Sequence, residues 1–80
     1  MILKITTKLL ERLVTNGSLQ LVPDANINVL ANEVVNQMPA AGFGSHFGSW
    51  LANTLIEHRW VEELYATNEE LTDMLRYINH

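Results

Sequence analysis

The chain of 80 residues contains no cysteine, and this absence excludes several kinds of chemistry. Disulfide bonds, thiolate nucleophiles, zinc ribbons and cysteine-ligated iron–sulfur clusters all require thiol groups. A chain without thiols suits a reducing compartment, and we therefore expect a cytoplasmic protein.

Long hydrophobic runs are also missing. No uninterrupted apolar stretch approaches the ~18 residues that a membrane-spanning helix needs. Lys4 interrupts the N-terminus too early for a secretory hydrophobic region. The sequence therefore predicts no membrane insertion, while its hydrophobic fraction of 48% is typical of a chain that folds.

Positive charge is scarce, with five Lys and Arg residues against nine Asp and Glu residues and a net charge of −4. The first 44 residues have equal numbers of acids and bases. The excess of acids lies in residues 45–80, at Glu57, Glu62, Glu63, Glu69, Glu70 and Asp73. Because duplex binding draws on several cations that neutralise phosphates, nucleic acid is an unfavoured partner.

The length predicts one domain, residues 1–80, with room for one core, and the spacing of apolar residues predicts that this domain is helical. A domain this small is only marginally stable, which favours help from a larger protein partner or from a second copy.

The spacing of apolar residues predicts an all-α bundle of four short helices over residues 3–15, 25–38, 46–65 and 68–79. Asn16-Gly17 ends the first helix, and Asp24 or Asn26 caps the second, which Pro39 ends. Residues 67–70, Thr-Asn-Glu-Glu, form a capping box at the start of the fourth.

Three points of this prediction stay open. Thr6 or Thr7 could cap a shorter first helix that follows an extended segment over residues 1–5. Residues 18–22 alternate briefly between polar and apolar side chains and are followed by Pro23. This pattern predicts a short extended segment and no full sheet. Ser45 or Ser49 caps the third helix, and the sequence does not decide whether that helix runs unbroken through Tyr65.

Two motifs invite chemical interpretations. The glycine-rich stretch over residues 42–48 precedes a helix and offers free amides for an anion. It has neither a preceding strand nor a P-loop lysine, so a plain connection between helices is favoured. His58 and Glu62 have the spacing of a metal-binding or acid–base pair on one helix, but neither enough ligands nor a nucleophile accompanies them. We therefore expect no catalytic residue, no metal and no cofactor.

Aromatic residues gather over residues 43–65, where acidic residues are also dense. Exposed tryptophan and tyrosine side chains are common interface anchors, and an acidic face attracts a basic partner. The expected partner-binding residues are Trp60, Glu62, Glu63, Tyr65 and Phe43. Core packing is an equally good interpretation of Trp60, and simple solvation is the plainer interpretation of the acids.

Two segments have a local resemblance to the theta accessory subunit of bacterial DNA polymerase III. Residues 50–59, Trp-Leu-Ala-Asn-Thr-Leu-Ile-Glu-His-Arg, are similar to one of its helices in the placement of Trp, Leu-Ile and His-Arg. Residues 28–39 are loosely similar as well. The glycine loop would be an insertion and the rest of the chain does not match, so we assign no family.

By elimination, the sequence favours a small non-catalytic protein–protein interaction module: an adaptor, accessory subunit or inhibitor that docks an aromatic and acidic surface on a larger protein. The alternative is a small dimeric helix-turn-helix DNA-binding regulator, with residues 39–45 as the turn and 46–60 as the reading helix.

Overall fold

The computed structural model describes residues 2–38 and 46–78, which form four helices and a two-stranded sheet. Helix α1 spans Ile2–Thr15 and buries its predicted apolar stripe, including Leu9 and Leu13. Gly17 ends the turn after this helix with a φ of 82°, a conformation that glycine adopts without strain. The predicted first helix and its stop signal are both confirmed.

Helix α2 spans Ile27–Asn36, slightly shorter than predicted. Asn26 is its cap, because the Asn26 side chain accepts hydrogen bonds from the backbone N–H groups of Asn28 and Val29, at 2.9 and 3.2 Å. These bonds satisfy two amides that have no partner inside the first turn. Of the two predicted caps, the structure therefore uses Asn26.

A short antiparallel sheet corrects the all-α prediction to a mostly helical fold. Strand β1, Leu19–Leu21, confirms the predicted extended segment, and it pairs with strand β2, Val61–Leu64. Two further backbone bonds extend the pairing, from the Tyr65 N–H to the Ser18 carbonyl and from the Val22 N–H to the Trp60 carbonyl. The sheet thus joins two segments about 40 residues apart in the chain.

Helix α3 spans Phe47–Glu57, so the predicted helix over 46–65 is wrong beyond residue 57. His58 has an extended backbone, and the chain then turns through a bond from the Val61 N–H to the His58 carbonyl before entering β2. At the other end, His46 occupies the cap position without a side-chain hydrogen bond, and Ser49 lies inside the helix. Ser45, the other predicted cap, lies outside the described residues.

Helix α4 spans Asn68–Ile78 and begins with the predicted capping box. The Thr67 hydroxyl accepts from the Glu70 N–H at 3.1 Å, while the Glu70 carboxylate accepts from the Thr67 N–H at 3.0 Å. This reciprocal pair fixes where the last helix starts.

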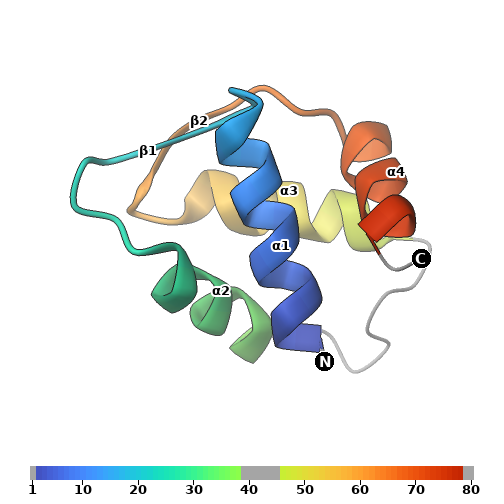
Figure 1. Ribbon diagram of the computed structural model, residues 1–80, viewed down its shortest axis with the longest axis horizontal. Coiled ribbons are helices and arrows are strands. Elements are labelled where there is room, and N and C mark those ends of the chain that lie inside the picture. Colours follow the sequence, from blue (N-terminus) through green and yellow to red (C-terminus); the bar gives the residue numbers. More distant parts are fainter. Residues whose placement is uncertain (1, 39–45, 79–80) are drawn as a thin grey trace.

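Helices α1 and α3 face each other across one core, and α1 crosses in front of α3 in Figure 1. Helix α2 packs mainly on α1, α4 packs on α3 and α1, and the sheet lies at the edge of the bundle beside α3 (Figure 1). The largest fully buried side chains are Leu9, Leu10, Leu13, Leu19, Leu30, Val34, Leu51, Leu55, Leu71 and Thr6. Within the described residues, no helix has the length and apolar character needed to cross a bilayer.

Candidate functional site

Strand β2 contains a bulge at the predicted acidic pair. Leu64 pairs with Leu19, Glu63 with Gln20 and Val61 with Leu21, so Glu62 has no residue opposite it. In a regular strand, residues three apart face opposite sides of the sheet. The extra residue of a bulge changes this alternation, and Val61 and Leu64 both pack against the core while Glu62 and Glu63 are both exposed.

Two large apolar side chains lie beside these acids. Ile56, from the last turn of α3, is 61% exposed, and Tyr65, directly after β2, is 59% exposed. Ile56 borders a shallow pocket of about 200 Å³ together with both glutamates and the inward residues of β2. We call Ile56, Glu62, Glu63 and Tyr65 the β2 surface.

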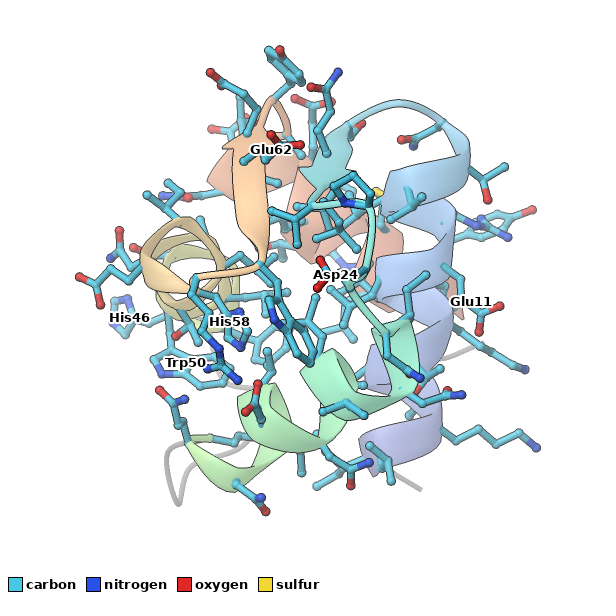
Figure 2. All side chains as sticks on the ribbon, turned by 90° about the vertical axis from the view of Figure 1, so that its left-hand side faces the viewer. Glu11, Asp24, His46, Trp50, His58 and Glu62 are labelled. Carbon is cyan, nitrogen blue, oxygen red and sulfur yellow. The ribbon has the colours of Figure 1, made fainter. Side chains whose placement is uncertain are left out.

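Neither Glu62 nor Glu63 forms an ion pair with any described residue. The spacing of His58 and Glu62 does not bring them together, because His58 follows the end of α3 and Glu62 lies in β2. Figure 2 shows Glu62 on the strand at the top of the view, well separated from His58, which lies lower in the molecule.

The partner of His58 is Glu33 of α2 instead. The Nε2 atom of His58 lies 2.6 Å from the Glu33 Oε2 atom, and the His58 side chain is only 6% exposed. Arg59 reaches the other carboxylate oxygen of Glu33 at 3.4 Å. The guanidinium of Arg59 also lies over the ring of Trp60, 5.0 Å from its centroid. These four residues, which we call the Glu33 cluster, join α2 to the turn between α3 and β2.

The hydrogen bonds fix the tautomer of His58. Its Nδ1 atom lies 3.1 Å from the backbone N–H of Trp60, which can only donate. Nδ1 is therefore the unprotonated nitrogen, and Nε2 carries the proton that it donates to Glu33. Both ring nitrogens are thus engaged, which leaves no lone pair for a metal ion or for general-base chemistry.

The same contacts change the acidity of Glu33. The hydrogen bond from His58 is the main cause, with the positive charge of Arg59 beside it, and together they hold the pKa of the Glu33 carboxyl below its ordinary value of 4.5. Partial burial opposes this effect without reversing it. Within the described residues, no three His, Asp or Glu side chains come together in a group able to hold a metal ion.

The structure separates the predicted partner-binding residues into two places. Glu62, Glu63 and Tyr65 share the β2 surface. Trp60 is half-buried, packs against the core and belongs to the Glu33 cluster, its ring centroid 5.4 Å from that of His58. Phe43 lies outside the described residues, as does most of the glycine-rich stretch. Gly48, the described glycine of that stretch, packs inside α3 against Asn68 and Thr72.

Sequence reasoning missed three residues of these sites, namely Ile56, Glu33 and Arg59. Ile56 lies on α3 outside the buried stripe that contains Leu51 and Leu55. This helical position is the sequence signal that could have identified Ile56 as exposed. Glu33 had no local signal, because its partner is 25 positions away in the chain.

Comparison with protein-family models, curated proteins and solved structures finds no match for this chain. The geometry of the β2 surface and of the Glu33 cluster is therefore the basis for inferring a function.

Proposed function

We propose that this protein is a non-catalytic interaction module, an adaptor, accessory subunit or inhibitor, that docks its β2 surface on a larger protein. One observation carries the proposal: the exposed Ile56 borders one pocket with Glu62 and Glu63, two carboxylates that have no ion-pair partner among the described residues, and the exposed Tyr65 directly follows β2. Grouped apolar exposure beside polar groups is typical of contact sites, and tyrosine is enriched at their centres.

The surface chemistry defines the partner class. Glu62 and Glu63 attract Lys or Arg side chains, and an apolar side chain is needed to cover Ile56 and Tyr65. We therefore expect a basic segment with at least one apolar anchor. The engaged ring nitrogens of His58 support a role without catalysis.

A simpler role for the two glutamates is protection of an open strand edge. Bulges and charged side chains both discourage unwanted pairing at a sheet edge. Lysine protects an edge as well as glutamate does. Charge reversal therefore keeps this protection and removes the attraction for a basic partner, which separates the two roles experimentally.

The helix-turn-helix alternative has less support. The helices of that motif are joined by three or four residues, whereas residues 37–46 separate α2 from α3. Helix α3, which would read the bases, contains neither lysine nor arginine. Few contacts would therefore hold it on a phosphate backbone.

The test is quantitative affinity capture from the source cells with three forms of the chain. They are the wild type, the β2-surface variant Glu62→Lys/Glu63→Lys, and the control variant Glu69→Lys/Asp73→Lys on α4. Both variants replace two acids by two lysines and bring the net charge from −4 to zero, so general charge effects are matched. Tyr65→Ser is a fourth form that leaves the charge unchanged.

We expect the wild type and the α4 control to capture the same protein in constant stoichiometry. The β2-surface variant and Tyr65→Ser should lose it, while circular dichroism shows that both remain folded. Equal capture by the β2-surface variant contradicts the proposal. Salt-sensitive retention on duplex DNA, with no protein captured, supports the regulator instead.

A further inference from the structure

A second surface of opposite charge lies between α1 and α4. A groove of about 530 Å³ is bordered by Lys8, Glu11 and Arg12 of α1 and by Tyr77 and Ile78 of α4. Figure 2 shows Glu11 on the outer side of α1, away from Glu62, which lies on the strand at the top of the view. The groove is thus separate from the β2 surface.

The cations of this groove have no ion-pair partner among the described residues. The guanidinium of Arg12 lies over the ring of Tyr77, 5.3 Å from its centroid, and Tyr77 is 72% exposed. Stacking holds the flat guanidinium in place, and its fork of N–H donors matches the two oxygens of a carboxylate. Lys8 lies one helical turn before Arg12 and adds a second positive charge.

Thr15 and Asn16 also line the groove, and Asn16 offers a donor. Asn16 uses its side-chain oxygen to accept from the Ser18 N–H at 2.9 Å, which leaves its amide N–H₂ as the group available to a ligand. Two cations and a free amide donor favour an anion, while Tyr77 and Ile78 provide apolar contact beside it.

We propose that the α1–α4 groove binds a short acidic segment of a partner protein, in which Asp or Glu stands next to an apolar side chain. Lys8 and Arg12 against Glu11 give the lining only one net positive charge. That charge suits a carboxylate better than a run of phosphates. The net charge of −4 on the whole chain also repels long polyanions such as nucleic acid. This proposal is independent of the one for the β2 surface.

The test is a titration of the isotopically labelled full chain, followed by amide and side-chain NMR shifts. The probe is a short blocked peptide with a Glu-Leu-Glu centre, and a peptide with a Gln-Leu-Gln centre is its neutral control. We expect saturable shifts at Lys8, Arg12 and Tyr77 with the acidic peptide, and none with the neutral one.

Single variants on α1 provide matched controls. Lys8→Glu should weaken binding at least about fivefold, whereas Lys4→Glu, the same charge change one turn outside the groove, should leave it nearly unchanged. Arg12→Lys keeps the charge but loses the stacked fork, and should also weaken binding. Glu62→Lys/Glu63→Lys should bind the peptide as the wild type does.

Several results would overturn the groove proposal. Equal losses for Lys4→Glu and Lys8→Glu would indicate diffuse attraction without a site. Tighter binding of duplex DNA than of the acidic peptide would indicate a polyanion surface. Shifts at the same residues that depend on protein concentration alone would show that a second copy occupies the groove.

Discussion

Glu33 joins α2 to the turn before β2 through its contacts with His58 and Arg59. Its pKa lies below 4.5 because His58 donates a hydrogen bond to the carboxylate and Arg59 lies beside it. A carboxyl with a lowered pKa stabilises the fold above its unfolded-state pKa. This contribution disappears as the pH falls through the folded-state value.

The variant Glu33→Gln keeps an acceptor for His58 but cannot ionise. We expect it to be less stable than the wild type at about pH 6, with the difference shrinking steadily below about pH 4.5. Urea denaturation of both proteins across this range measures the difference, because the other acids are common to both. A difference that stays constant down to about pH 2.5 would show that the charge of Glu33 does not stabilise the fold.

Thr6 has a fully buried side chain whose hydroxyl has no hydrogen-bond partner among the described residues. Burying an unpaired hydroxyl costs free energy, and valine has nearly the same shape without that group. We predict that Thr6→Val raises the free energy of unfolding by about 1 kcal/mol.

The neighbouring threonine is the control for this substitution. Thr7 uses its hydroxyl to donate to the Leu3 carbonyl at 2.8 Å, so Thr7→Val removes a bond that is made. In thermal and urea unfolding, Thr6→Val should be more stable than the wild type and Thr7→Val should be less stable. Greater destabilisation by Thr6→Val than by Thr7→Val would show that the Thr6 hydroxyl has a partner.

At the level of elements, α3 and α4 approach each other closely at Gly48. A Cβ atom at this position would overlap the Asn68 carbonyl oxygen and the Thr72 hydroxyl. The carbonyl belongs to the backbone of α4, so a rotamer change of Thr72 alone cannot remove the clash. The small size of Gly48 therefore sets the spacing of the two helices.

We predict that Gly48→Ala lowers the free energy of unfolding by about 2–3 kcal/mol or prevents folding. The exposed neighbour Ser49→Ala should change stability by less than about 0.5 kcal/mol. Gly17→Ala, which has open space but a positive φ, should cost about 1 kcal/mol. Denaturant unfolding of the three variants tests this order, and a harmless Gly48→Ala would contradict the close packing.

The sequence predicted the elements whose ends are encoded locally. Three short-range signals mark boundaries of predicted helices. Asn26 marks the start of α2, the Thr67–Glu70 box marks the start of α4, and Gly17 follows the end of α1. Strand β2 was missed for a physical reason. Its bulge places inward residues three apart, at Val61 and Leu64, and this spacing is also that of a helix.

The end of α3 was missed because its cause is long-range. The helix ends before His58, whose ring is hydrogen-bonded to the Glu33 carboxylate through one nitrogen and to the Trp60 N–H through the other. A sequence window around residue 58 contains no glycine or proline to indicate this stop. The candidate site also depends on long-range structure. The sequence identified Glu62 and Glu63 as acidic residues, but their shared exposure comes from strand β2, which forms only in the tertiary fold.

At the scale of the whole molecule, the charges are segregated. The acidic β2 surface comes from the second half of the chain, and the cations of the α1–α4 groove come from the first helix. The two surfaces lie apart on the molecule, with Glu62 on the strand and Glu11 on the outer side of α1 (Figure 2). This arrangement is suited to a small protein that joins a basic segment to an acidic one.

Hydrogen–deuterium exchange of the chain, with and without the protein that it captures, tests the central claim most directly. Binding at the β2 surface should slow exchange at the backbone amides of residues 56–65 and leave residues 8–16 nearly unchanged. Protection confined to α1 and α4, with residues 56–65 exchanging as fast as in the free protein, would contradict the account.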